Sequence, residues 1–492
     1  MKDPSFIAYD IGASSGRTVL GTLVGRQLEI QEMSRFTNEM LHLHGHWHWD
    51  IYRLFHEMKK GLQACAAEQG KRLTSLAVDT WGVDFGLLSA GGSLLGLPFA
   101  YRDSRTAGVM ERFFEKMPQA EVYRRTGIQF MSFNTLFQLY AMKLESSPLI
   151  DQAEDLLFMP DLCNFFFTGE KRSEFTYATT SQLCHPESRT WDPELFASLG
   201  LPSSWMQEIA DPGSVLGPLD RTVLDDTAAP AMQVIQVASH DTACAVAAVP
   251  ARGEGWAFIS SGTWSLLGVE RKKPLLTEQA REMNFTNEGG MDRTIRFLKN
   301  ISGLWLLQQC KAVWDRNPAQ RHNYDPLLHG AESAAPFRFI VDPDHESFLN
   351  PKDMPEAIRS YCRRTGQPLP ESPFEFTRGI LESLALKYRF VLDQLKQIST
   401  TPIHCIHVIG GGARNALLCQ FTADATGLPV FAGPLEATAI GNIMIQVRTL
   451  GHVDSLAEMR EVVRNSFTPR CYEPGSAEGW AAAYERCKAL IT

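Results

Sequence analysis

The chain repeats one short pattern, once near its start and once near its middle. Residues 6–10 form an apolar run that leads into a glycine- and serine-rich turn, and a second apolar run follows at residues 18–21. Residues 256–259, another such turn and residues 265–269 repeat this order. The pattern predicts a strand–turn–strand hairpin, in contrast to the strand–turn–helix of a Walker P-loop. Because 492 residues exceed one ordinary hydrophobic core, the repeat predicts two duplicated α/β domains.

Helical and extended patterns alternate along the rest of the chain. Asp50 is a suitable N-cap for a helix whose apolar residues recur every three or four positions over residues 51–62, and a strand is expected at residues 76–79. A long helix is expected over residues 378–397, and residues 407–425 read as a strand, a triple-glycine turn and a helix. This alternation favours an α/β architecture.

The proline- and glycine-containing stretch at residues 250–255 is the expected junction between the domains. The boundaries that follow are residues 1–249 for the first domain and residues 255–455 for the second. A C-terminal extension, residues 456–492, is expected to pack on the second domain.

Charge and cysteine usage exclude several classes of partner and site. Lysine and arginine number 47 against 56 aspartate and glutamate residues, a net charge of −9, so no basic excess exists to bind nucleic acid or an anionic membrane. No apolar run reaches the roughly eighteen residues of a membrane span, and residues 1–6 lack the apolar core of a signal peptide. The ten cysteines are scattered without a CxxC pair, so we expect reduced thiols in a cytoplasmic protein.

The first turn has the chemistry of a phosphate-binding loop. Gly12 and Gly16 allow a tight turn whose backbone N–H groups and serine hydroxyls could surround a phosphate, and Arg17 could pair with a phosphate oxygen. Asp10, at the end of the strand, could hold Mg²⁺ directly or through water. A plain hairpin explains the same residues equally well.

Asp241 is the candidate proton acceptor. A sugar hydroxyl that attacks a γ-phosphorus must lose its proton, and a carboxylate can accept it. His240 and Thr242, on either side, could orient the sugar through its other hydroxyls. Asp241 would also serve as the N-cap of the helix that follows, and both interpretations can hold together.

Two further segments could contact a nucleotide. The second turn, residues 260–265, repeats the first, and its Thr263 could donate to a phosphate. The triple glycine at residues 410–412 would let a ribose or a flat ring approach the backbone closely. A hairpin and a tight strand–helix link are the structural alternatives.

Three polar segments are less specific. Residues 79–85 combine polar groups with Trp81 and could stack a sugar, although burial in the core is the commoner fate of such an aromatic. Residues 101–105 form a similar polar cluster, with surface ion pairs as the alternative. His42, His44, His46 and His48 alternate and would share one face of a single strand, and we interpret them as a solvated or sugar-facing edge, because no zinc pattern completes them.

Taken in order, these segments resemble the FGGY carbohydrate kinases, which share the actin-like, ribonuclease-H-like ATPase fold with two domains around an interdomain cleft. The resemblance runs nearly end to end. The segments that carry it are residues 10–17, 78–84, 100–106, 127–130, 133–135, 159–161, 237–242, 260–265, 287–290, 303–308, 410–412, 432–434 and 436–437.

The resemblance implies ATP-dependent phosphorylation of L-rhamnulose at its 1-hydroxyl, giving L-rhamnulose 1-phosphate and ADP, in L-rhamnose breakdown. It implies that the first domain mainly binds sugar and the second mainly nucleotide, in a monomer or dimer. It assigns Asp241 as proton acceptor and Asp10 to Mg²⁺. The implied sugar ligands are Gly82, His240, Thr242 and Asn300, and the implied ATP contacts are Ala13, Ser14, Ser15, Gly16, Arg17, Thr263, Gln308 and Gly411. Some family members pair cysteines in the second domain, but Cys362 has Gly379 as its counterpart here, so no disulfide is expected.

Three alternatives stay open. A kinase of the same family could act on L-fuculose, D-xylulose or a polyol. An actin-like ATPase without sugar kinase activity would belong to a different class, although no filament-contact loop or client-binding domain is recognisable. A catalytically inactive sugar sensor is disfavoured by the intact set of Asp10, Asp241 and Thr263.

Overall fold

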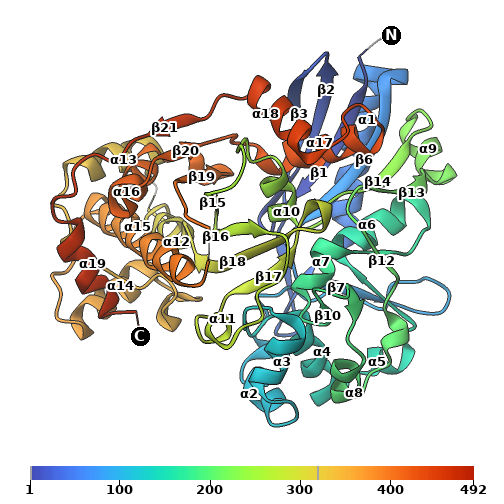
Figure 1. The fold of residues 1–492 in the computed structure, drawn as a ribbon. Helices are drawn as coiled ribbons and strands as arrows, with labels where there is room; N and C mark the ends of the chain where they lie inside the picture. Colours follow the sequence, from blue (N-terminus) through green and yellow to red (C-terminus); the bar gives the residue numbers. More distant parts are fainter. Residues whose placement is uncertain (1–2, 318–320, 400, 492) are drawn as a thin grey trace. The chain divides into compact units, whose positions relative to one another are not determined.

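The computed structural model describes residues 3–317, 321–399 and 401–491, and it divides the chain into two compact units (Figure 1). The first unit comprises Met1–Pro250, Glu270–Phe297 and Ala437–Phe467. The second unit comprises Ala251–Val269, Leu298–Glu436 and Thr468–Thr492. The chain therefore passes between the units several times, and residues 437–467 are part of the first unit.

A six-stranded sheet forms the centre of the first unit. Its order is β13 (Ser214–Pro218), β14 (Gln233–Gln236), β6 (Leu73–Thr80), β1 (Ser5–Ile11), β2 (Ser15–Val24) and β3 (Gln27–Thr37). Strands β1 and β2 form the hairpin that the turn chemistry predicts, whereas β6 runs parallel to both β1 and β14. The expected α/β architecture is confirmed in this unit.

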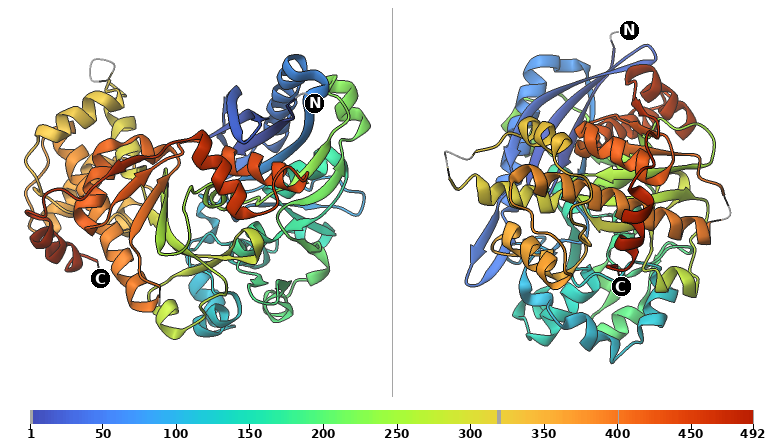
Figure 2. Two further views of the ribbon diagram at one scale, coloured as in Figure 1. Left: turned by 45° about the horizontal axis from the view of Figure 1, so that its top comes forward. Right: turned by 90° about the vertical axis from the view of Figure 1, so that its left-hand side faces the viewer.

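Helices cover both faces of this sheet. Successive side chains of β1 point to opposite faces, so each face packs against its own helices. Ile7, Tyr9 and Ile11 belong to the core on the face of α1 (Ile51–Gln69) and α6 (Met159–Thr168). On the opposite face, α17 (Ala437–Thr449) lies against β1, β6 and α10 (Asp241–Ala247), as the views of Figures 1 and 2 show. Asp10 and Asp79 are opposite each other in the parallel register and share that second face.

Helix α1 forms as its sequence predicts. The Asp50 side chain accepts a hydrogen bond from the Arg53 backbone N–H, and the helix ends before Gly70, whose φ is +53°. Leu54, Met58 and Leu62 are buried at helical spacing, and Phe55 is half-buried beside them.

The remaining elements of the first unit are short, and most of them connect or flank the sheet. They are β4 (Met40–Leu43), β5 (His46–Trp49), β7 (Phe85–Leu88), α2 (Val109–Phe114), α3 (Gln119–Thr126), α4 (Thr135–Leu144), α5 (Pro148–Gln152), β8 (Asp155–Phe158), β9 (Ser173–Glu174), α7 (Phe175–Thr180), β10 (Cys184–His185), β11 (Thr190–Trp191), α8 (Pro193–Leu199), β12 (Ile209–Ala210), α9 (Arg221–Thr227), α11 (Glu278–Glu282), β17 (Thr286–Gly289) and α18 (Leu456–Ser466).

The alternating histidines lie on a hairpin and not on one strand. His44 and Gly45 form its turn, with φ of +50° and +90°, between β4 and β5. His42 therefore faces Trp47 across the hairpin, whereas His46 and His48 point to the other side. The interpretation as one shared face of four histidines is wrong, because the left-handed turn at residues 44–45 reverses the chain.

The second unit repeats the hairpin within its own sheet. Its neighbouring strands are, in order, β16 (Trp264–Arg271), β15 (Trp256–Ser261), β19 (Cys405–Ile409), β20 (Val430–Ala432) and β21 (Arg470–Tyr472). Strands β15 and β16 are antiparallel, and β19 runs parallel to both β15 and β20. The duplicated strand–turn–strand pattern is therefore confirmed. Strand β18 (Ile295–Ser302) precedes the helices of this unit.

Helices of the second unit gather around the long helix α15 (Pro373–Ile398), which packs against α13 (Tyr324–Ser333), α16 (Ala416–Thr426) and α19 (Trp480–Lys488) (Figure 1). The others are α12 (Trp305–Trp314) and α14 (Met354–Arg364). Helix α15 begins five residues earlier than residue 378, because Ser372 caps it and Pro373 occupies its first turn. Asn415 caps α16 by accepting from the Leu418 N–H.

Two whole-chain expectations can be compared with the described residues. All ten cysteines are free thiols, in agreement with the expected absence of a disulfide. Within residues 3–317, 321–399 and 401–491, no helix combines the length and apolar character needed to cross a membrane.

Candidate functional site

Asp241 is the first residue of α10 and follows a loop after β14. The N-cap position belongs to His240, so the prediction that Asp241 caps the helix is wrong by one residue. One carboxylate oxygen, Oδ1, accepts from the Thr242 N–H at 2.5 Å and the Thr242 hydroxyl at 3.1 Å. The Asp241 side chain is 31% exposed. Its carboxylate is therefore oriented by its own helix start and open to a substrate.

The predicted sugar ligands of the first unit lie together around this carboxylate. His240 pairs with Thr80 at the end of β6, where the Thr80 N–H donates to the Ser239 carbonyl at 2.9 Å. A Cβ on Gly82 would lie 3.3 Å from His240 Nε2, so glycine leaves this side of the imidazole open. Asn300 lies on β18 in the second unit.

Glu174, which sequence reasoning did not single out, holds the loop that carries His240. Its Oε2 accepts from the Ser239 N–H at 2.9 Å and from the Thr176 hydroxyl at 2.6 Å. The Thr176 hydroxyl oxygen in turn accepts from the His240 N–H at 3.3 Å. Burial raises the pKa of this fully enclosed carboxyl. The backbone before Asp241 is thus anchored to α7.

The imidazole of His240 is flanked by a buried ion pair that sequence reasoning also missed. Arg296 and Glu288 lie 3.2 Å apart, and both approach His240 Nδ1. His240 Nε2 faces Asp241 at 3.5 Å. Residues 287–290 carry part of the family resemblance, but no sequence pattern brings Glu288 to His240.

The conformation of the first turn is fixed mainly by contacts with other residues of the chain. Asn38 braces it, because its backbone N–H donates to the Ser14 carbonyl and its side-chain amide donates to the Gly12 carbonyl. Gly16 is required by packing, since a Cβ there would lie 2.4 Å from the Phe36 ring. Arg17 pairs with Asp10 at 2.6 Å. Ala13, Ser14 and Ser15 remain as the turn residues that could contact phosphate.

Asp10 lies near other acidic side chains, and this arrangement matters for cation binding. Asp79 is fully buried; its Oδ2 accepts from Asn442 at 2.7 Å, whereas its Oδ1 has no hydrogen-bond partner. Burial, together with the nearby Asp10 and Asp241 carboxylates, raises the pKa of Asp79 well above its usual range. Among the described residues, no three His, Cys, Asp or Glu side chains are arranged as a metal cage. The donors fit Mg²⁺ held chiefly by phosphate and water, which is its usual preference.

In the second unit, two predicted ATP ligands contact each other. The Thr263 hydroxyl donates to Gln308 Oε1 at 3.1 Å. Gly303 lies beneath this turn, where a Cβ would come within 2.8 Å of the Gly262 carbonyl oxygen. The Leu304 N–H donates to that same carbonyl at 2.9 Å. The turn at residues 261–263 is thus fixed by the segment that leads into α12.

The three glycines after β19 serve two purposes. A Cβ on Gly412 would lie 2.0 Å from the Ser261 hydroxyl, and one on Gly410 would lie 3.2 Å from the Ser261 carbonyl oxygen. Nothing lies within 4 Å of the corresponding position on Gly411. Gly410 and Gly412 therefore allow the loop to pack on the β15–β16 turn, and Gly411 faces open space in the described structure.

Trp81 is a core residue and not an exposed sugar platform. It is 5% exposed, and its indole N–H donates to Asp84 Oδ2 at 2.8 Å. Trp49 donates to the same oxygen at 2.7 Å, and Gln138 donates to Oδ1 at 2.9 Å. Burial raises the pKa of Asp84 to about 6, although these donors oppose the shift.

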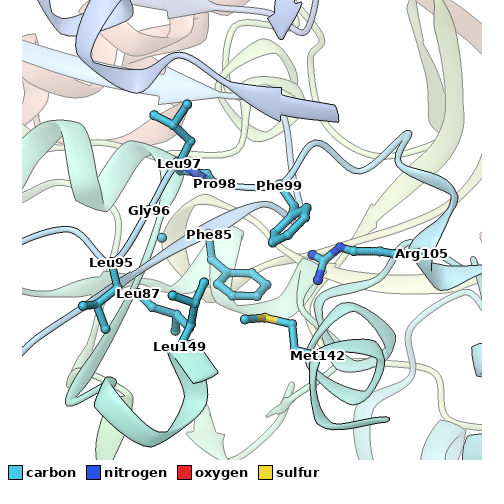
Figure 3. Close-up of a pocket in the computed structure, with 11 residues that line it drawn as sticks. Phe85, Leu87, Leu95, Gly96, Leu97, Pro98, Phe99, Arg105, Met142 and Leu149 are labelled. Atoms are coloured by element: carbon cyan, nitrogen blue, oxygen red, sulfur yellow. The ribbon is translucent and has the colours of Figure 1, made fainter. Parts of the chain in front are cut away.

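The polar cluster at residues 101–105 is also internal, so its interpretation as surface ion pairs is wrong. Asp103 accepts from the Trp47 N–H at 2.7 Å, and the Arg105 guanidinium donates to Gln138 and stacks over Phe99. Burial lowers the pKa of Arg105 to about 10. Arg105 also borders a pocket whose other labelled lining side chains are apolar (Figure 3). Such a lining offers few partners for sugar hydroxyls, so we do not place the sugar there.

Comparison with known proteins shows which family and which proteins the chain is similar to. Residues 5–248 match the N-terminal domain of the FGGY family of carbohydrate kinases, and residues 257–450 match its C-terminal domain. The chain is similar to a rhamnulokinase of Bacteroides thetaiotaomicron, with 46% identity over 99% of both chains. It is similar to those of Oceanobacillus iheyensis, at 41% over 96% of this chain and 99% of the relative, and Bacillus subtilis, at 39% over 95% of both.

Solved structures share the fold at low sequence identity. The gluconate kinase of Lactobacillus acidophilus aligns with a TM-score of 0.80 over 99% of this chain and 97% of its own, at 15% identity. Plasmodium falciparum glycerol kinase with ADP aligns with a TM-score of 0.78 over 99% and 98%, at 14% identity.

Proposed function

We propose a reaction from one premise: the chain belongs to the FGGY family of carbohydrate kinases. Its fold is the two-domain, actin-like ATPase type of that family, as the sequence resemblance predicts. The proposed reaction is phosphorylation of L-rhamnulose by ATP at the 1-hydroxyl, giving L-rhamnulose 1-phosphate and ADP, as a step of L-rhamnose catabolism. Identities of 39–46% to rhamnulokinases over 95% or more of the chain support this choice of sugar.

One observation carries the chemistry: the Asp241 carboxylate is partly exposed and oriented beside His240 and Gly82. In the proposed step, Asp241 accepts the proton of the 1-hydroxyl. The hydroxyl oxygen then bonds to the γ-phosphorus of ATP, and the bond from that phosphorus to the β,γ-bridging oxygen breaks. A base within hydrogen-bond reach of the attacking hydroxyl contributes roughly 10²–10⁴ in rate.

The remaining sugar contacts are proposed for Gly82, His240, Thr242 and Asn300. Glycine at position 82 gives the sugar access to the imidazole, because its missing side chain would lie against His240 Nε2. His240 and Thr242 offer polar hydrogens to the sugar oxygens next to the reacting hydroxyl. These contacts would hold one hydroxyl at Asp241 and exclude alternatives.

ATP contacts are proposed for Ala13, Ser14, Ser15, Gly16, Arg17, Thr263, Gln308 and Gly411. The turn at residues 12–15 presents backbone N–H groups of the kind that bind phosphate oxygens. Arg17 can share its guanidinium between Asp10 and a phosphate, because it carries five N–H donors. Gly411, which faces open space, suits close approach of the adenosine.

We also propose that Asp10 holds Mg²⁺ through water, since its carboxylate is already paired with Arg17. Bound Mg²⁺ would offset the negative charge of the phosphates. Asp79 lies beside Asp10 on the same sheet face, and one of its buried oxygens has no hydrogen-bond partner. We propose a cytoplasmic monomer or dimer whose partners are the sugar and ATP.

A coupled ADP-release assay with a panel of sugars tests this proposal. L-Rhamnulose, L-fuculose, D-xylulose and glycerol are offered separately at equal concentration with MgATP. The highest kcat/KM is expected for L-rhamnulose, with little ADP release when sugar is omitted. Faster turnover of another sugar would replace the proposed substrate, and sugar-independent ATP hydrolysis at the same rate would contradict kinase activity.

A further inference from the structure

A closed polar group surrounds the imidazole of His240 within the first unit. Arg296 Nη2 lies 3.1 Å from His240 Nδ1, and Glu288 Oε2 lies 3.3 Å from the same nitrogen. Arg296 Nη1 and Glu288 Oε2 are 3.2 Å apart, held by charge and not by an aligned hydrogen bond. Arg296 Nε donates to the Gly289 carbonyl at 2.7 Å, which ties the guanidinium to β17.

Both members of the ion pair are buried and charged. The side chain of Arg296 is 0% exposed and that of Glu288 is 5% exposed. Burial alone would raise the pKa of Glu288, but Arg296 and His240 outweigh it, and the pKa lies below its usual range. A buried ion pair is costly unless further contacts compensate for the lost hydration. Besides the bond from Arg296 to the Gly289 carbonyl, both members of this pair contact His240, which indicates a role beyond stability.

The partners of Nδ1 determine where His240 carries its proton. The Glu288 carboxylate at 3.3 Å by itself favours a hydrogen on Nδ1, but a guanidinium nitrogen has only hydrogens to offer, so the shorter 3.1 Å contact with Arg296 requires a lone pair there. A neutral imidazole then carries its hydrogen on Nε2, which faces Asp241 Oδ1 at 3.5 Å. If the ring is doubly protonated, Nδ1–H faces the Glu288 carboxylate and loses the contact with Arg296, and Nε2 still carries a hydrogen. The remaining tautomer would turn a lone pair of Nε2 toward the Asp241 carboxylate.

We propose that Glu288 and Arg296 are positioning residues: Glu288 holds the Arg296 guanidinium beside Nδ1, and the guanidinium fixes His240 with a hydrogen on Nε2, directed at Asp241 and the sugar. This inference rests on the proposed function for the role of Asp241. A fixed donor at Nε2 orients the carboxylate and offers a hydrogen bond to a sugar oxygen beside it. The ion pair acts through His240 and touches neither the sugar nor the reacting atoms.

Other groups around the imidazole leave this arrangement in place. The Tyr177 ring lies edge-on to His240 at 6.4 Å between centroids, and its hydroxyl donates to the Asp84 carbonyl at 2.9 Å. Glu174 is committed to the Ser239 and Thr176 N–H groups and to the Thr176 hydroxyl. Neither group competes for the ring nitrogens.

A double-mutant cycle on activity separates positioning through His240 from plain structural support. Glu288→Gln removes the charge at nearly constant shape, and His240→Ala removes the group on which it acts. We expect Glu288→Gln to lower kcat for the sugar roughly 10- to 100-fold, with the KM for ATP unchanged. In the His240→Ala background the same change should alter kcat less than twofold. An equal loss in both backgrounds, or no loss in either, would overturn the proposal.

A matched control tests whether the loss of any buried ion pair has this effect. Glu270, whose side chain is 15% exposed, accepts from Arg460 at 3.0 and 3.1 Å elsewhere in the first unit. Glu270→Gln should lower the melting temperature and leave kcat/KM unchanged.

NMR can identify the tautomer of His240 in the wild-type protein, without a substitution in the ion pair. With ¹⁵N-labelled histidine, the His240 signals, assigned by their absence in His240→Ala, should show a protonated Nε2. A protonated Nδ1 with an unprotonated Nε2 would overturn the proposal, even if Glu288→Gln does not fold.

If the wild-type protein prefers another ketose, the cycle is run with that ketose, and only the choice of L-rhamnulose fails. If it phosphorylates no sugar, the proposed function fails and the tautomer spectrum alone decides this inference.

Discussion

Asp241 joins two properties that a proton acceptor needs: a fixed orientation and partial exposure. Asp241→Asn keeps the size of the side chain but removes its ability to accept a proton. We expect an unchanged melting temperature and a kcat lowered by roughly 10²–10⁴. Steady-state ADP release and thermal unfolding of the purified variant measure both quantities. Turnover like that of the wild type would remove Asp241 from its proposed role.

The buried carboxyl of Asp84 makes the stability of the first unit depend on pH. Its folded pKa is about 6, above the value of an unfolded aspartate near 3.9, so between these values the folded state holds a proton that the unfolded state has lost. Its contribution to stability is therefore present at low pH and is lost as the pH rises through about 6.

The corresponding test compares the wild type with Asp84→Asn, which has no charge to bury. A two-unit shift is worth about 3 kcal/mol in full, and the unfolded carboxyl is already about half ionised at pH 4, so the free energy of unfolding of Asp84→Asn relative to the wild type should rise by roughly 2 kcal/mol from pH 4 to pH 7. Urea unfolding at both pH values measures it. A difference that does not change with pH would contradict the assigned pKa.

At the residue scale, sequence reasoning found the groups that are adjacent in the chain or at the ends of strands. Three of the four predicted sugar ligands, Gly82, His240 and Thr242, lie together beside the predicted proton acceptor Asp241. Glu174 and Glu288 were missed, since each is an ordinary charged residue in a short strand and gains its role only when the fold brings it to the loop at residues 239–240.

At the scale of elements, the glycine loop after β19 offers a matched pair of adjacent positions. Gly412→Ala would force a methyl group to within 2.0 Å of the Ser261 hydroxyl, whereas Gly411→Ala meets nothing within 4 Å. We expect Gly412→Ala to lose about 1–3 kcal/mol of stability, the usual cost of overpacking. Gly411→Ala should melt like the wild type and raise the KM for ATP severalfold, with the KM for sugar unchanged.

Thermal unfolding and substrate titrations of the two variants decide this point. An unchanged KM for ATP in Gly411→Ala would remove this loop from the proposed adenosine site. Normal stability in Gly412→Ala would show that the loop does not need its close contact with Ser261.

Element types could largely be predicted from periodicity and turn chemistry, and the two hairpins and helix α1 are examples. The histidine run was misjudged because alternation was followed through Gly45, where a positive φ turns the chain back. Helix α15 was started too late, because the cap at Ser372 lies outside the apolar repeat that indicated the helix.

At the scale of the whole molecule, the first unit depends on a helix that arrives late in the chain. Gln446 of α17 donates to the Ile7 carbonyl at 2.9 Å, and Asn442 donates to Asp79 at 2.7 Å. A Cβ on Gly441 would lie 1.8 Å from the Cys244 carbonyl oxygen, which shows how closely α17 approaches α10. No periodicity in residues 437–449 could indicate which sheet they cover, because that choice depends on contacts with distant strands.

We therefore predict that α17 opens together with the sheet of the first unit. Asn442→Ala leaves the Asp79 carboxyl buried without its partner, so amide exchange should accelerate in α17, β1 and β6 and stay unchanged in α15 and α16. Tyr484→Phe, which removes the hydrogen bond to Asp393 in the second unit, is the matched control and should accelerate exchange around α15 and α19. Hydrogen exchange followed by mass spectrometry reads all of these segments. Acceleration of α17 together with α15 in Asn442→Ala would contradict this assignment.

The central claim concerns which sugar receives the phosphate and at which carbon. Equimolar L-rhamnulose, L-fuculose and D-xylulose are mixed with a limiting amount of MgATP and the enzyme, and the products are identified by ³¹P–¹H correlation NMR. We predict that L-rhamnulose 1-phosphate accounts for nearly all of the transferred phosphate. Phosphate found mainly on another ketose, on another carbon of L-rhamnulose, or only as inorganic phosphate would contradict the account.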